Sequence, residues 1–155
     1  MDIFTVSLFG HRDISDLRRL DKLLTPIIKE LILEKPYVSF LIGRNGEFDE
    51  YSASIIKRAQ KDYGKENNEL TLVLPYKLAN LEYYEKYYDS ITIPESIYKA
   101  HHKAAITLKN RWMIEQSDLV IVYVEGDSGG AYTAMKYAIK LKKTVINLFE
   151  YSDQF

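Results

Sequence analysis

Short apolar runs alternate along the chain with longer segments in which apolar residues recur every three or four positions. The runs are rich in β-branched and aromatic residues and have the length of strands; they are residues 3–9, 37–43, 69–75, 118–124 and 144–149. The recurring pattern predicts helices with one buried face over residues 17–31, 48–59, 97–112 and 128–141. The tyrosine-rich stretch 78–96 predicts a short helix and then a loop that ends at Pro94.

This alternation indicates a parallel sheet whose strands are joined by right-handed crossovers. The runs are almost continuously apolar, which is typical of a sheet covered by helices on both faces. We therefore predict one α/β domain over residues 1–155, a Rossmann-like, doubly wound parallel sheet of about five strands. No repeat, linker or low-complexity segment divides the chain.

Composition narrows the classes of function. The 155 residues are 46% hydrophobic, and their net charge of −1 lacks the basic surplus of proteins that neutralise a nucleic-acid backbone. The absence of cysteine excludes disulfides, thiolate catalysis and cysteine zinc sites. No apolar stretch approaches the ~20 residues that span a bilayer, and the N-terminus lacks the basic region of a signal peptide. We expect a cytoplasmic protein with no membrane contact, and the charge balance disfavours a nucleic-acid partner.

Six of the seven glycines lie in the loops that follow the first, second and fourth predicted strands. They are Gly10, Gly43, Gly46, Gly126, Gly129 and Gly130. The carboxyl ends of parallel strands share one edge of the sheet, so these loops should converge. Glycine lets backbone approach a ligand closely, and a helix that follows offers free amides to an anion. We expect a ligand pocket at this edge; ordinary strand-to-helix turns are the alternative.

Four stretches in this order carry a resemblance to a known family: GHRD, GRNGEFDEYSA, KNRWMIEQSDLVIVYV and GDSGGAYTAMKYA. The chain resembles the SLOG superfamily, the Rossmann-like group that contains the DprA/Smf DNA-processing proteins, the LOG phosphoribohydrolases and the YpsA-like proteins. The resemblance covers nearly the whole chain and is closest to the small, single-domain YpsA-like branch, also called DUF1273. It implies a nucleotide or nucleotide-derived ligand lying across the glycine loops.

On this resemblance, Gly129 and Gly130 match the glycine pair of the family and form a phosphate cradle with Ser128 at a helix N-terminus. Thr133, one turn into the helix, supports the cradle or only packs. Asp127 would repel a phosphate, so we expect it to cap the helix or to face a ribose hydroxyl. An N-cap formed by Ser128 or Asp127 without any ligand is the alternative.

The LOG enzymes extend this motif with a further glycine, a threonine and a catalytic glutamate. This sequence has Tyr132 at the place of that glycine and Lys136 at the place of the glutamate, which argues against their phosphoribohydrolase route. Glu47 and Asp49 follow Gly46, and cleavage of an N-glycosidic bond needs a carboxylate near the anomeric carbon. Glu47 is placed for that role, although we rank a ribose contact first and a favourable helix N-terminal charge second.

Basic and aromatic residues follow the same strands. Arg12 offers a planar fork for a phosphate, and Arg44 is a second phosphate candidate or an exposed charge. His11 contacts a ligand or holds its own loop in place. Tyr76, after the third strand, is placed to stack on a base. Arg111, near the end of the long helix, would hold a carboxylate of the pocket.

We assign Trp112 to the core, and the pair His101-His102 has no partners at metal-ligand spacing, so we expect no metal. The leading hypothesis is a sensor domain that binds a nucleotide-type small molecule. A nucleoside or nucleotide N-glycosidase or transferase that uses Glu47 or Asp49 is the alternative. Single-stranded DNA binding ranks third because of the charge balance. The base, the number of phosphates and a homo-oligomer stay open.

Overall fold

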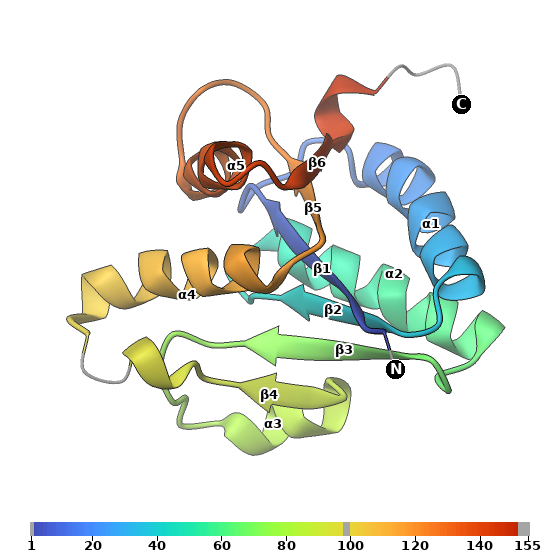
Figure 1. Ribbon diagram of the computed structural model, residues 1–155, viewed down its shortest axis with the longest axis horizontal. Helices are drawn as coiled ribbons and strands as arrows, with labels where there is room; N and C mark the ends of the chain where they lie inside the picture. Colours follow the sequence, from blue (N-terminus) through green and yellow to red (C-terminus); the bar gives the residue numbers. More distant parts are fainter. Residues whose placement is uncertain (1, 98–99, 152–155) are drawn as a thin grey trace.

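The computed structural model describes residues 2–97 and 100–151. Within them, six parallel strands form one sheet in the order β4-β3-β2-β1-β5-β6 (Figure 1). The strands are β1 (Phe4–Gly10), β2 (Val38–Ile42), β3 (Asn68–Val73), β4 (Ser90–Thr92), β5 (Leu119–Tyr123) and β6 (Thr144–Asn147). The helices are α1 (Leu17–Glu34), α2 (Glu47–Tyr63), α3 (Leu81–Tyr87), α4 (His102–Gln116) and α5 (Gly130–Lys140), with the 3-10 turns η1 (Glu95–Ile97) and η2 (Leu148–Glu150).

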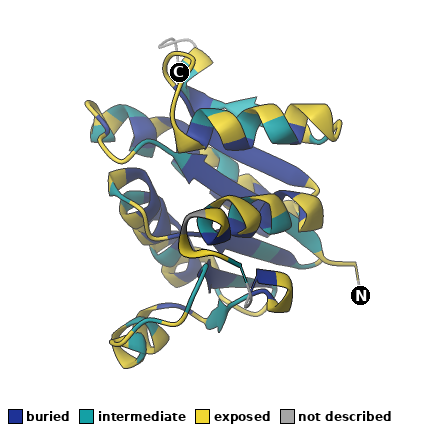
Figure 2. Cartoon of the chain, turned by 90° about the vertical axis from the view of Figure 1, so that its left-hand side faces the viewer, coloured by how far each residue is buried: buried dark blue, intermediate teal, exposed yellow. Residues whose placement is uncertain are grey.

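Helices cover both faces of the sheet. α1 and α2 pack on one face, and α4 and α5 pack on the other (Figure 1). Along β1, Val6 and Leu8 belong to the core under α1 and α2, whereas Phe9 belongs to the core under α4 and α5. Figure 2 shows buried strands between helices whose outer sides are exposed. The predicted doubly wound α/β fold is confirmed.

The sheet has one strand more than the five that the apolar runs predicted. β4 lies in the tyrosine-rich stretch, after the short helix α3, where a loop was expected. Its sequence, Ser-Ile-Thr, contains no apolar run, and none of the three residues is fully buried. Asp89, just before β4, accepts hydrogen bonds from the Leu70 amide at 2.7 Å and from Nε2 of Gln60 at 2.8 Å. This polar contact joins the start of β4 to β3, with which β4 pairs, and hydrophobic periodicity does not detect it.

The helix predicted over residues 97–112 begins later and ends later than its pattern indicated. α4 begins at His102, and Ile97 lies in the separate turn η1. The helix continues to Gln116, beyond the last apolar residue of the predicted face. Trp112 is only partly buried, against the core under α4 and α5. The apolar spacing therefore joined two helical segments that the structure separates.

The order of the strands reverses at β1. This strand pairs with β2 on one side and with β5 on the other. The chain first adds β2, β3 and β4 outward from β1, and then returns to add β5 and β6 on the opposite side. The carboxyl ends of β1 and β5 therefore flank the point at which open α/β sheets bind ligands.

The last residue of β1, Gly10, packs against α2, where an added Cβ would overlap with the fully buried ring of Phe48. We expect Gly10→Ala to lower the free energy of unfolding by about 1–3 kcal/mol, because the ring has no free space to enter. Chemical denaturation measures this change. Gly130→Ala is the matched control, since a Cβ there meets nothing within 4 Å. An equal loss in both variants would contradict the packing explanation.

Candidate functional site

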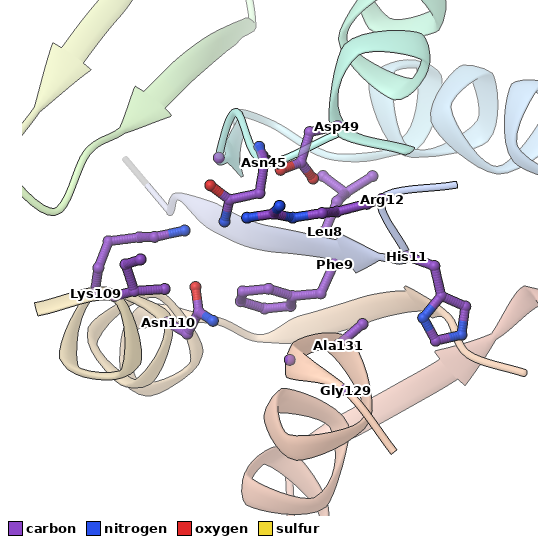
Figure 3. Close-up of a pocket in the computed structure, with 14 residues that line it drawn as sticks. Leu8, Phe9, His11, Arg12, Asn45, Asp49, Lys109, Asn110, Gly129 and Ala131 are labelled. Atoms are coloured by element: carbon purple, nitrogen blue, oxygen red, sulfur yellow. Dashed lines mark hydrogen bonds between the residues drawn. The ribbon is translucent and has the colours of Figure 1, made fainter. Parts of the chain in front are cut away.

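A cavity of about 350 Å³ opens at the carboxyl end of β1, between the loops that follow β2 and β5. Four segments line it: the end of β1 with its loop, the loop after β2 with the first turn of α2, the middle of α4, and the start of α5 (Figure 3). The lining residues are Leu8, Phe9, Gly10, His11, Arg12, Gly43, Asn45, Asp49, Ile106, Lys109, Asn110, Gly129, Gly130 and Ala131. The volume lies in the range of small-molecule sites.

The structure brings together about half of the predicted site residues. Those that line the cavity are Gly10, His11, Arg12, Gly43, Asp49, Gly129 and Gly130. Those that do not line it are Arg44, Gly46, Glu47, Tyr76, Arg111, Asp127, Ser128 and Thr133. Three polar lining residues were not singled out from the sequence, namely Asn45, Lys109 and Asn110.

The N-terminus of α5 borders the cavity without a side-chain cap. Gly129, at φ +98°, is the N-cap residue, and no side chain caps the helix. Asp127 and Ser128 are exposed and precede this position, so the alternative in which one of them caps the helix is wrong. Thr133 donates its amide and its hydroxyl to the Gly129 carbonyl, each at 3.0 Å. The first amides of a helix lack partners within it, and those at Gly130 and beyond favour an anion.

Lys109 extends from α4 into the cavity (Figure 3). The residue is only 2% exposed. Within the described part of the chain, its ammonium group has no hydrogen-bond or ion-pair partner. Burial lowers the pKa of Lys109 from its ordinary value to about 8, and the negative charge of Asp49 opposes this shift. A buried cation without a direct partner therefore faces the cavity.

Asp49, in the first turn of α2, is the second buried charged residue, at 7% exposure. Its Oδ2 accepts a hydrogen bond from the Asn45 amide at 2.8 Å. Burial raises the pKa of this carboxyl, while the Asn45 hydrogen bond and the charge of Lys109 act in the opposite direction. A Cβ on Gly43 would lie 2.8 Å from Nζ of Lys109 and 3.2 Å from Oδ2 of Asp49. Both charged groups thus lie against bare backbone at the end of β2.

The loops after β1 and β2 are joined through their backbones. The Glu47 amide donates to the Arg12 carbonyl at 2.8 Å, and a Cβ on Gly46 would overlap with the backbone of Arg12. Oε1 of Glu47 accepts a hydrogen bond from the Ile14 amide at 2.9 Å. The Glu47 carboxylate therefore holds the β1–α1 loop, and the side chain of Arg12 extends over the cavity (Figure 3).

His11 connects the loop after β1 with the loop after β5. Its Nε2 accepts a hydrogen bond from the Glu125 amide at 2.8 Å. The ring therefore holds its loop in place, as one of the two predicted roles required, while it also lines the cavity. Nε2 is already used by the protein in this arrangement.

Two predicted ligand contacts are engaged with other side chains. Nε of Arg44 donates to Oη of Tyr84 at 3.1 Å, and the guanidinium lies 5.3 Å from the centre of the same ring. The ring of Tyr76 stacks on His102 at a centroid distance of 4.1 Å. The guanidinium of Arg44 is therefore engaged by Tyr84, and one face of the Tyr76 ring is covered by His102.

Arg111 and the tyrosine-rich segment lie at other cavities. The guanidinium of Arg111 lies 5.1 Å from the centre of the Tyr137 ring, beside a groove between α4 and α5. The tyrosines of α3 and its end line a separate cavity with Glu50; they are Tyr83, Tyr84, Tyr87 and Tyr88. Neither group is among the described residues that line the cavity at the end of β1.

The sequence carried a signal for Lys109 that the apolar pattern of α4 obscured. The predicted face included Leu108, which is 36% exposed in the structure. The buried face instead contains Ala105, Lys109 and Met113, which are spaced four residues apart. A lysine in register with two buried apolar residues is the signal. No comparable spacing marks Asn45, which lies in a loop.

Some further properties follow from the described residues. Between residues 2–97 and 100–151, no three histidine, aspartate or glutamate side chains gather in a way that could hold a metal ion. In the same ranges, no helix has the length and hydropathy that crossing a membrane requires.

Comparisons with known proteins show a likeness in fold. The chain matches no protein-family model and no curated protein sequence. It is similar to the structure of DNA processing protein A (DprA) from Streptococcus pneumoniae, with a TM-score of 0.68 and 14% identity over 92% of this chain and 49% of DprA. It is also similar to the molybdenum cofactor carrier protein of Chlamydomonas reinhardtii, with a TM-score of 0.58 and 13% identity over 93% of this chain and 75% of that one.

The chain therefore spans about half the length of DprA. At these identities the likeness shows the fold alone, which is the Rossmann-like fold shared with DprA. This agrees with the superfamily that the sequence resembles, while the YpsA-like branch stays a prediction.

The lowered pKa of Lys109 makes stability depend on pH. Between about pH 8 and its ordinary value of 10.5, an unfolded chain keeps the lysine proton while the folded chain has lost it. Because the unfolded state then binds more protons at this residue, the contribution of Lys109 to stability rises with pH across this window, while the raised pKa of Tyr88 acts in the opposite direction near pH 10. We expect Lys109→Met to remove a rise of about 3 kcal/mol, measured by denaturation at several pH values. Lys61→Met, which removes an exposed lysine, should keep the rise; an identical profile for both variants would contradict the assignment.

Proposed function

We propose that this domain binds a nucleotide or a nucleotide-derived small molecule, with a phosphate against Lys109, Arg12 and the N-terminus of α5. The observation that carries the proposal is the buried ammonium group of Lys109, which faces the cavity without a partner among the described residues. Burying a cation is costly unless an anion compensates for the lost water. Asp49 compensates only in part, because burial also favours its own neutral form. A ligand phosphate would supply the missing negative charge.

The rest of the lining supports an organic anion over an inorganic one. Leu8, Phe9, Ile106 and Ala131 give the cavity an apolar side. Asn110 contributes a buried Oδ1 that has no hydrogen-bond partner in the described residues. Such an oxygen can accept from a base amino group or a ribose hydroxyl. Apolar walls with a few polar groups are typical of small-molecule sites.

The structural neighbours support a binding role without choosing the ligand. One is named a DNA processing protein and the other a carrier of the molybdenum cofactor. We place this chain in the YpsA-like branch of the superfamily on its sequence motifs. Single-stranded DNA is the less favoured ligand, because the net charge of −1 gives no general attraction for a phosphate backbone.

An N-glycosidase or transferase is the second candidate function. One observation favours it, the buried carboxylate of Asp49 in the cavity lining. A carboxylate beside an anomeric carbon can stabilise positive charge or act as a nucleophile. The carboxylate of Glu47 accepts a hydrogen bond from the Ile14 amide and does not line the cavity. In this alternative we therefore assign the chemistry to Asp49 and a positioning role to Glu47.

A thermal-shift screen of nucleoside monophosphates, nicotinamide dinucleotides and ADP-ribose tests the proposal, since a ligand at one hundred times its Kd adds about 2.7 kcal/mol to the free energy of unfolding.

For the best ligand, we expect Lys109→Met to weaken binding at least about tenfold, because a charge-assisted hydrogen bond is lost. Gly130→Val should abolish binding in a folded domain, because its side chain would occupy open space beside the helix N-terminus. Lys61→Met is the control. Unchanged affinity in Lys109→Met would refute the phosphate assignment.

A turnover assay separates the binder from the enzyme. Asp49 is the only acid among the described residues that line the cavity, whereas glycosidases ordinarily use two carboxylates. We therefore expect little or no release of free base from nucleoside monophosphates. Chromatography of the reaction mixture measures this. Base release by the wild type that is lost in Asp49→Asn and retained in Glu47→Gln would instead establish the glycosidase.

A further inference from the structure

A second cavity, of about 470 Å³, follows the groove between α4 and α5. It shares three lining residues with the cavity described above, namely Ile106, Asn110 and Gly130. The two cavities are therefore neighbours with a common wall, and the N-terminus of α5 borders both. A ligand long enough to reach past the shared residues would contact both cavities.

The groove is lined by basic side chains and by no acidic one among its described lining residues. Arg111 comes from α4, and Lys136 and Lys140 come from α5. Three positive charges along one groove repel one another, and a bound anion relieves that repulsion. The groove is thus electrostatically suited to an anionic group.

Contacts around Tyr137 hold one of these cations in place. The Arg111 guanidinium lies 5.1 Å from the centre of the Tyr137 ring. Oη of Tyr137 donates to Oε2 of Glu115 at 2.6 Å, and this hydrogen bond raises the pKa of the tyrosine. Glu115 therefore fixes the ring on which the guanidinium lies, while it does not itself line the groove.

The common wall carries a buried polar atom that lacks a partner. Oδ1 of Asn110 is buried and has no hydrogen-bond partner in the described residues. Leaving such an oxygen unsatisfied costs about 1–3 kcal/mol, so a donor is expected there when the site is filled. Since Asn110 lines both cavities, that donor would belong to the part of a ligand that passes from one to the other.

We propose that the two cavities form one bipartite site for a ligand with two separated anionic groups, of the class of a 5′-phosphorylated dinucleotide. This inference rests on the proposed function, because the first phosphate is the one assigned to Lys109. The second phosphate binds in the groove, against Arg111 and Lys136. Lys136, which stands where the LOG enzymes have their catalytic glutamate, thereby has a ligand-binding role.

Calorimetric titration of the whole chain tests the proposal with AMP, GMP, CMP and UMP and with their 5′-phosphorylated dinucleotides pApA, pGpG, pCpC and pUpU. We expect Arg111→Met and Lys136→Met each to weaken the best dinucleotide about tenfold and its mononucleotide less than about twofold. Lys109→Met should weaken both. Both groove residues are exposed, so their variants should fold, and Lys61→Met is the control for loss of a lysine charge.

The outcomes distinguish the two proposals. If Lys109→Met weakens both ligands and the groove variants bind dinucleotide as the wild type does, the bipartite site is refuted and the nucleotide site survives. If the wild type binds none of the eight probes, the bipartite site is refuted, and the nicotinamide dinucleotides and ADP-ribose of the thermal-shift screen decide the nucleotide site. A strand of about ten nucleotides of the best-binding base is titrated as well. If it binds more tightly than the dinucleotide, with a steeper dependence on salt, the groove belongs to a longer nucleic-acid surface and the small-ligand proposal is refuted.

Discussion

Close backbone approach at the ends of β1 and β2 determines where the walls of the cavity lie. Gly10 leaves room for the ring of Phe48, and Gly46 leaves room for the backbone of Arg12. These contacts bring the first turn of α2 against the β1 loop, and the hydrogen bonds of Glu47 then fix that loop. A side chain at either glycine would separate the two loops, so the position of every group on this side of the cavity depends on them.

Inside those walls, burial and charge act against each other. Lys109 and Asp49 are both removed from water. Burial lowers the pKa of Lys109 and raises the pKa of Asp49, and both shifts favour the neutral form of the side chain. The attraction between them opposes both shifts without joining them in a direct ion pair. The protein thus keeps a cation and an acid within one small volume, the lining of a single cavity.

Alternating apolar runs and helical periods were sufficient to predict the layers of the fold, because packing against both faces of a sheet determines those patterns. β4 was not predicted because it has no apolar run; the contact that joins its start to β3 is the polar one of Asp89. The glycine loops located the cavity, whereas the residues that face it were harder to predict. Glu47 and Asp49 are two positions apart on one helix, so they point in different directions, and only the packed structure shows that Asp49 faces the cavity. Lys109 was missed because a charged residue in a helix is ordinarily assigned to the solvent side.

The two ends of the sheet also restrict how copies of this chain can associate. Both edge strands are short, with β4 spanning Ser90–Thr92 and β6 spanning Thr144–Asn147. Short edges present few unpaired amides and carbonyls to another molecule, so the sheet is a poor template for strand addition. The helices, by contrast, carry exposed apolar side chains, and Tyr83 of α3, at 71%, is the most exposed large hydrophobic one among the described residues.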